Sequence, residues 1–227
     1  MRIGDWLNKP ETRQTVGYHV ALLGGVALLV SAVIGVADAL TRADIAQRQL
    51  EDLQATLRQV VPARYYDNDL VRDVVTVRDG ERPVQVYRAR RDGAVQAVSF
   101  QVSAPGYGNT AMRIILGMDR DGALLGVRVV SHSETPGLGD KIETRRSDWI
   151  RSFDGRSLND PPPAGWGVKK DGGVFDQFTG ATITPRSVVK AVKNGLEFFA
   201  AHRAELLDES ATPSPPGDKV GMGEAKP

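Results

Sequence analysis

The chain has 227 residues, of which 41% are hydrophobic and 25% charged, enough for one sizeable domain with appendages. Its 29 basic residues nearly balance 28 acidic residues, so the charge gives no indication of nucleic-acid binding. The absence of cysteine excludes disulfides, thiol catalysis and cysteine-ligated iron–sulfur clusters within this chain. The three histidines, His19, His132 and His202, lie far apart and form no metal-ligand pattern.

An apolar stretch near the N-terminus predicts a transmembrane helix over residues 16–40. Residues 16–37 contain no charged side chain and, at 1.5 Å per residue, span roughly 33 Å as a helix, enough for the hydrocarbon core. A cleaved signal peptide is the alternative, because Ala37-Asp38-Ala39 resembles a signal-peptidase site, although signal cores usually have only ~7–15 residues. The basic residues before the span predict that residues 1–15 are cytoplasmic.

The following segment, residues 41–62, predicts an amphipathic juxtamembrane helix. Its apolar side chains recur at alternating four- and three-residue spacing: Ala46, Leu50, Leu53, Leu57 and Val60. This helix could extend the membrane span, dock on a partner or pack on its own domain.

From about Asp69 to Ser131 the pattern changes to strands. Three Asp-Gly turn signals begin at Asp79, Asp92 and Asp121, and they separate β-rich runs at 84–87, 95–102, 113–118 and 124–130. The alternation around Phe100 predicts a sheet with one buried face. No βαβ rhythm or G-x-G-x-x-G occurs, which disfavours a Rossmann unit and indicates that any NADH oxidation takes place on another protein.

Two loops are candidates for a ligand site. In the first, His132-Ser133-Glu134-Thr135-Pro136-Gly137-Leu138-Gly139, two glycines and a proline predict a tight loop whose backbone can face a ligand. An ordinary Pro-Gly turn with a surface His132 and Glu134 is the alternative. A turn, Lys170-Asp171-Gly172-Gly173, precedes the second loop. Its lysine could neutralise a phosphate or remain in solvent, and the remainder could be a simple turn.

The second loop is Asp176-Gln177-Phe178-Thr179-Gly180-Ala181-Thr182-Ile183-Thr184, followed by Pro185. A buried stripe of Val188, Val192, Leu196 and Phe199 predicts an amphipathic helix here. Because proline favours the first helical position, we expect Thr184 to be the N-cap. A phosphate esterified to Thr184 would lie near the free N–H groups at the start of the helix. Its interaction with the helix dipole would stabilise it by roughly 0.3–1 kcal/mol. The alternative is a plain helix cap.

The second loop resembles the pattern D-x-x-[ST]-G-A-[ST]-x-T that flavin transferases modify. The resemblance implies an FMN joined through its phosphate to Thr184, with Thr182 as the nearest alternative acceptor. Asp176, Thr179, Gly180 and Ala181 would complete that cofactor-binding motif. The first loop is similar to the H-x-E-T-P-G-L-G segment of FMN-binding domains, which implies that its residues line the isoalloxazine: Glu134, Thr135, Gly137, Leu138 and Gly139. Lys170 also fits that family.

Taken together, residues 15–205 look like the G subunit of the Rnf electron-transport complex. The resemblance implies an α+β fold: a single transmembrane helix, then an FMN-binding domain over residues 66–206 with an antiparallel sheet and flanking helices. It places this domain on the periplasmic side of the bacterial inner membrane. The tail, 208–227, is rich in Pro, Gly, Ser and charge, which predicts disorder.

The implied activity is electron relay between ferredoxin and NAD, coupled to ion translocation, with no metal and no acid–base residues in this chain. The implied partners are the other membrane and iron–sulfur subunits of the complex, together with a flavin transferase for maturation. The alternatives are the C subunit of the sodium-translocating NADH:quinone reductase, a non-redox anchored assembly or regulatory module, and a stand-alone envelope flavoprotein reductase.

Overall fold

The computed structural model describes residues 16–211. The expected cytoplasmic segment, residues 1–15, and residues 212–227 of the expected disordered tail lie outside the described residues. The chain divides between Glu51 and Asp52 into two compact units, each described here by itself.

The first helix, α3 (Val16–Val60), runs unbroken from the apolar stretch through the juxtamembrane segment. It contains no proline, and its second half is rich in good helix formers, so nothing in the local sequence stops it. Its most apolar 18-residue window has a mean hydropathy of 2.5 and is not buried. By length and composition α3 is therefore able to cross a membrane.

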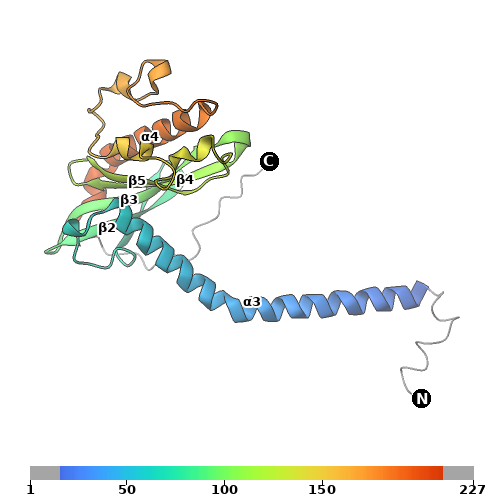
Figure 1. The fold of residues 1–227 in the computed structure, drawn as a ribbon. Coiled ribbons are helices and arrows are strands. Elements are labelled where there is room, and N and C mark those ends of the chain that lie inside the picture. The colour runs from blue at the N-terminus through green and yellow to red at the C-terminus, as the bar shows by residue number, and fades with distance from the viewer. Residues whose placement is uncertain (1–15, 212–227) are drawn as a thin grey trace. The chain divides into compact units, whose positions relative to one another are not determined.

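The second unit is built on a five-stranded antiparallel sheet (Figure 1). The strands are β1 (Val74–Asp79), β2 (Arg82–Arg91), β3 (Ala94–Pro105), β4 (Ala111–Asp119) and β5 (Leu124–Ser131), joined in the order β1-β2-β3-β4-β5. All four predicted runs lie within β2 to β5. The three Asp-Gly pairs make the turns, and Gly80, Gly93 and Gly122 adopt the positive φ that such turns require.

The second helix, α4 (Ile183–Leu206), packs across one face of this sheet and contacts β3 most extensively (Figure 1). Its predicted stripe is buried as expected, and Phe198 meets Phe100 edge-on with ring centroids 5.0 Å apart. The larger core forms between this stripe and the strand residues on the α4 face: Val86, Val98, Phe100, Ile114, Leu116 and Met118.

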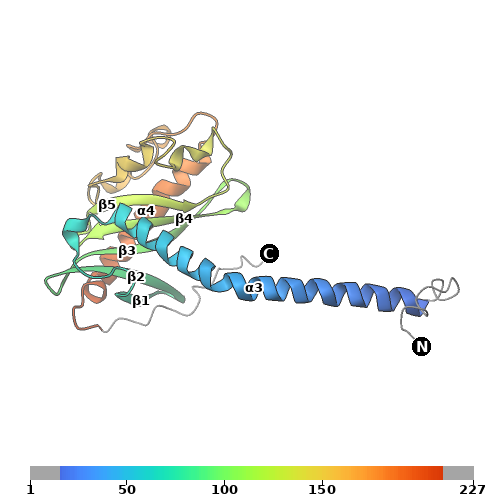
Figure 2. The ribbon, with the colours of Figure 1, turned by 60° about the horizontal axis from the view of Figure 1, so that its bottom comes forward.

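The opposite face of the sheet is also covered, which corrects the expectation of a single buried face. The end of α3 lies over that face (Figure 2). Its Leu57 and Val60 form a buried cluster there with Ala97 and Ile115. The approach is close because Gly117 and Gly126 lie opposite each other on β4 and β5 beneath Val60. A Cβ at Gly126 would lie 2.9 Å from Val60 Cα, and one at Gly117 would collide with the Val60 carbonyl.

The connection between β5 and α4 carries both candidate loops. It contains the 3-10 turns η3 (Gly139–Ile142), η4 (Trp149–Phe153), η5 (Pro163–Gly165) and η6 (Lys169–Asp171). Aromatic side chains with ring centroids 4.5 to 6.3 Å apart hold this irregular segment together: Trp149, Phe153, Trp166, Phe175 and Phe178. Aromatic burial therefore replaces regular secondary structure in fixing the position of the loops.

Candidate functional site

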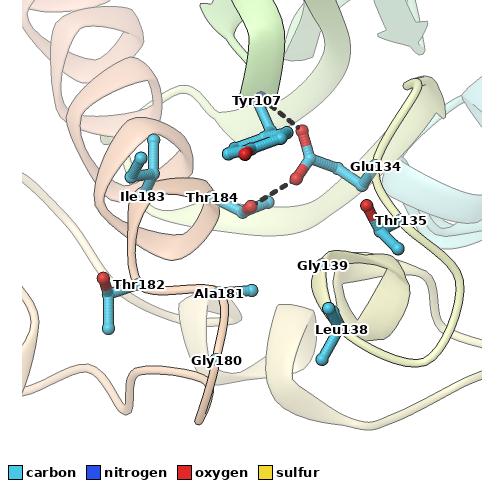
Figure 3. A pocket seen from close by; sticks show the side chains of 10 residues that line it. All are labelled: Tyr107, Glu134, Thr135, Leu138, Gly139, Gly180, Ala181, Thr182, Ile183 and Thr184. Atoms are coloured by element: carbon cyan, nitrogen blue, oxygen red, sulfur yellow. Dashed lines mark hydrogen bonds between the residues drawn. The ribbon is translucent and has the colours of Figure 1, made fainter.

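The two candidate loops meet at one cavity of about 250 Å³ (Figure 3). Its walls come from the first loop, from the second loop, which leads into α4 and is called the acceptor loop below, and from the turn after β3. The lining residues are Tyr107, Glu134, Thr135, Leu138, Gly139, Gly180, Ala181, Thr182, Ile183 and Thr184. Segments far apart in the sequence thus form a single site.

The acceptor loop owes its shape to an anchored aromatic residue and one glycine. Phe178 is buried against Trp149, with ring centroids 5.0 Å apart. The Ala181 N–H donates to the Phe178 carbonyl at 3.3 Å, and Gly180, at the third position of this turn, has φ +83°. A turn with positive φ at its third position favours glycine, which explains the glycine of the motif.

The start of α4 differs from the sequence prediction. The helix begins at Ile183, so its N-cap is Thr182, and no side chain caps it. Thr184 and Pro185 are the second and third helical residues, and the prediction of Thr184 as N-cap is wrong. Proline is tolerated throughout the first turn because the N–H groups there have no intrahelical partner, so it does not specify the first position.

The Thr184 hydroxyl, at the floor of the cavity, donates a hydrogen bond to Glu134 Oε2 (Figure 3). The backbone N–H of Tyr107 donates to the other carboxylate oxygen, Oε1, at 2.9 Å. Thr184 is 1% exposed and Glu134 6% exposed. Among the described residues Glu134 forms no ion pair. Its buried carboxylate accepts hydrogen bonds from uncharged donors instead.

Two glycines leave the space that the Glu134 carboxylate occupies. A Cβ at Gly139 would lie 2.9 Å from Glu134 Cβ and 3.0 Å from Thr184 Oγ1. A Cβ at Gly106 would lie 2.6 Å from Glu134 Oε1. Any larger residue at either position would therefore displace the carboxylate.

His132 orients the first loop without lining the cavity. The Glu134 N–H donates to His132 Nδ1 at 3.1 Å, so this nitrogen is unprotonated and the ring proton is on Nε2. His132 Nε2 in turn lies 2.7 Å from Glu143 Oε1. Arg145, which donates two hydrogen bonds to Glu143, is the largest cause that lowers the pKa of Glu143 to about 2.

Four predicted site residues do not line the cavity: Gly137, Thr179, Asp176 and Lys170. Gly137 shapes the first loop with φ +80°, and its N–H donates to Asp140 Oδ1 at 2.9 Å. Asp176 is exposed and pairs with Lys169 Nζ at 2.6 Å, while its carbonyl accepts a hydrogen bond from Trp149 Nε1. Lys170 is exposed, and a cofactor contact for these four residues remains a prediction.

The sequence reasoning did not identify two residues of the rim, Tyr107 and Ile183. Tyr107 is 65% exposed and Ile183 51% exposed, so both present apolar surface at the rim of the cavity. The signal available for Tyr107 was its place between Gly106 and Gly108, because glycine-flanked loops bring backbone close to ligands. Ile183 is the variable position of the acceptor motif, and no sequence signal pointed to it.

The FMN-binding domain family matches residues 106–197, which run from the Gly106 turn through both loops and into α4. Among solved structures, the C subunit of the Na⁺-translocating NADH-quinone reductase from Parabacteroides distasonis matches with a TM-score of 0.43 and 22% identity. That match covers 54% of this chain and 64% of the other.

Curated relatives extend the match to most of the chain. A protein from Cereibacter sphaeroides is 54% identical, covering 89% of this chain and 90% of its own. A second from Stutzerimonas stutzeri is 47% identical, with 88% of each chain covered, and a third from Pseudomonas aeruginosa is 44% identical, covering 86% and 94%. All three are named as the G subunit of an ion-translocating oxidoreductase complex. The chain belongs to this family of G subunits.

Proposed function

We propose that this chain is a membrane-anchored electron carrier whose FMN is attached covalently, through its phosphate, to Thr184. The observation that carries the proposal is the position of the Thr184 hydroxyl, which lines the cavity that both FMN-family loops surround. A non-redox assembly module gives no role to the Thr179–Thr184 run of the flavin-transferase motif.

The residues around the cavity fit a flavin held in this way. Gly139 and Gly180 line the cavity without side chains, and Thr184 lies in the first turn of α4, where unpaired N–H groups and the helix dipole favour a phosphate. The exposed apolar rim of Tyr107, Leu138 and Ile183 fits the flat face of a ring system.

The size of the cavity indicates how much of the flavin it encloses. Its volume is below the ~300–1,000 Å³ of sites that bury most of a drug-sized ligand. We therefore expect the phosphate end to be enclosed and part of the ring to remain accessible over the rim. An accessible ring edge suits a relay, because electrons must pass to and from partner proteins.

The flavin would supply the reversible electron transfer, while the protein supplies its position and surroundings. Thr184 would hold the phosphate, Glu134 and Thr135 would border it, and Leu138 with Tyr107 would limit access of water to the ring. The relay itself requires no proton-transferring residue in this chain.

We further propose that the carrier works within an Rnf-type complex, with other membrane and iron–sulfur subunits as partners. The names of the relatives support this assignment over the C-subunit alternative. In the proposed orientation α3 anchors the chain in the bacterial inner membrane and the flavin domain is periplasmic, with a flavin transferase loading it. Covalent attachment suits that location, because FMN lost outside the cytoplasm could not readily be replaced.

The test is co-expression of the full chain with a flavin transferase, followed by in-gel flavin fluorescence after SDS denaturation and by intact mass. We expect a fluorescent band that carries one FMN, its loss in Thr184→Ala and its retention in Thr182→Ala. Fluorescence retained by Thr184→Ala would overturn the attachment site. No band in the wild type, with the transferase active on a control substrate, would leave the non-redox module.

A further inference from the structure

We propose that Glu134 accepts the hydroxyl proton of Thr184 when the flavin phosphate is attached, and keeps it afterwards as a neutral carboxylic acid. The inference rests on the proposed function, since it concerns how the same site acquires its cofactor. It assigns acid–base chemistry to the loading step, which electron relay does not need.

The geometry places the proton acceptor on the nucleophile before any reaction. The Thr184 hydroxyl already donates to Glu134 Oε2, so the path of the proton is a hydrogen bond that exists in the folded chain. A side chain within hydrogen-bond reach of the proton that it removes meets the first requirement for a general base. An unassisted threonine hydroxyl is a weak nucleophile, and an adjacent base is the usual means of activating it.

No neighbouring group of the first loop can take this role. His132 lies nearby, but its Nδ1 accepts the Glu134 N–H and its Nε2 contacts Glu143. The buried Asp140 accepts the Gly137 N–H, and its other carboxylate oxygen lies 3.3 Å from Arg146 Nε. Within residues 16–211, Glu134 is the group hydrogen-bonded to Thr184 Oγ1.

The attachment step balances with a flavin dinucleotide, an activated flavin phosphate, as co-substrate. Thr184 Oγ1 attacks the flavin-side phosphorus and forms the new P–O bond. The pyrophosphate P–O bond breaks, and a nucleoside monophosphate leaves with the bridging oxygen. The hydroxyl proton passes to Glu134 Oε2, and nothing is oxidised or reduced.

Attachment also changes what Glu134 faces. The esterified Thr184 oxygen has no proton to donate, and the linked phosphate is an anion beside the buried carboxylate. Two adjacent negative charges destabilise each other strongly in a poorly solvated site. The retained proton removes this repulsion and lets Glu134 donate toward the ester, while Oε1 still accepts the Tyr107 N–H.

The experiment measures the rate of FMN attachment to the full chain with purified transferase and flavin dinucleotide, followed by intact mass. In Glu134→Gln the amide oxygen can accept the Tyr107 N–H and the amide nitrogen can donate to Thr184, so the shape is kept but no proton can be taken. We expect attachment to slow by roughly 10²–10⁴-fold, the usual contribution of a general base. Glu134→Asp keeps a carboxylate and should load faster than Glu134→Gln.

Glu197→Gln, the same substitution on the exposed face of α4, is the matched control and should load at the wild-type rate. Wild-type loading by Glu134→Gln would overturn the proposal. Equal rates in the Gln and Asp variants would also overturn it, since Glu134 would then only position the hydroxyl. Absence of FMN on the wild type would instead refute the proposed function.

A second measurement does not depend on how the variants fold. Infrared difference spectra of the wild-type chain before and after attachment, with ¹³C-labelled glutamate carboxyls, should show a new label-sensitive carboxylic-acid C=O band. A loaded protein without this band would show that Glu134 does not retain the proton.

Discussion

Two of the buried carboxylates in the second unit, Asp73 and Glu134, have opposite surroundings. Asp73 is 7% exposed and Glu134 6% exposed, so the two pay a similar desolvation penalty. Asp73 is held by two guanidinium groups, with Arg88 Nε 2.7 Å from Oδ1 and Arg90 Nε 2.5 Å from Oδ2. Within residues 16–211, Glu134 accepts from a hydroxyl and a backbone amide.

This difference in partners indicates different roles for Asp73 and Glu134. Two arginines fix the position of Asp73, and its fully buried partner Arg88 extends the network to the carbonyls of Asp208 and Ala211, which ties the end of the described chain to β2. Around Glu134 the described donors are neutral, and no cation is fixed against the carboxylate. The first group is suited to stability and the second to reaction.

The largest expected effect is on stability, at Asp73. Asp73→Asn should destabilise the unit by about 3–5 kcal/mol, because it leaves the positive charges of Arg88 and Arg90 without their carboxylate partner in a buried network. Denaturant unfolding of the full chain in detergent measures this, with Asp79→Asn in the exposed β1–β2 turn as control. FMN attachment to the folded fraction should be unchanged, and a loss of attachment in that fraction would break the distinction between the two carboxylates.

The next effect is on attachment, at Gly139. In Gly139→Ala the new Cβ would push Glu134 away from Thr184, and a displacement of this kind can cost on the order of 10²-fold in rate. Gly167→Ala is the control, since its Cβ would meet only ordinary contacts at 3.8 Å. The same attachment assay applies, and equal rates in the two variants would mean that the close approach of Glu134 is not needed.

Gly117, on the face of the sheet that the end of α3 covers, should affect stability and leave attachment unchanged. Gly117→Ala should destabilise the packing of the α3 end by roughly 1–3 kcal/mol, because the Val60 backbone cannot yield easily. Unfolding measurements detect this loss, and attachment to the folded protein should stay at the wild-type rate. Slower attachment would show that this packing and the site are coupled.

The smallest effect is pH-dependent and concerns Glu143. Because its pKa is lowered from 4.5 to about 2, chiefly by the hydrogen bond from Arg145, its stabilising contribution is complete above pH 4.5 and is lost as the pH falls through about 2. The contribution should stay below about 1 kcal/mol, since Arg145 is largely exposed. Hydrogen exchange of residues 132–143 across this range should show the loss in the wild type and not in Glu143→Gln.

Local sequence patterns predicted most of the secondary structure correctly. The Asp-Gly turns were placed because a positive φ is specified by the residue that must adopt it. The strands and the α4 stripe followed from periodicities of two and 3.6 residues. The N-cap was placed two residues late, because a proline in the first turn does not define its own position.

By itself the sequence determined the strands and their turns, the membrane-length apolar helix and the two loops, since each depends on residues that are neighbours in the chain. The antiparallel sheet and the candidate acceptor Thr184 came from the family resemblance. Only the tertiary structure decided that Glu134, 50 residues before Thr184, accepts a hydrogen bond from the Thr184 hydroxyl. It also decided that Tyr107 borders the cavity and that Gly117 admits Val60. Such contacts follow from how the elements pack, which no periodicity or turn signal encodes.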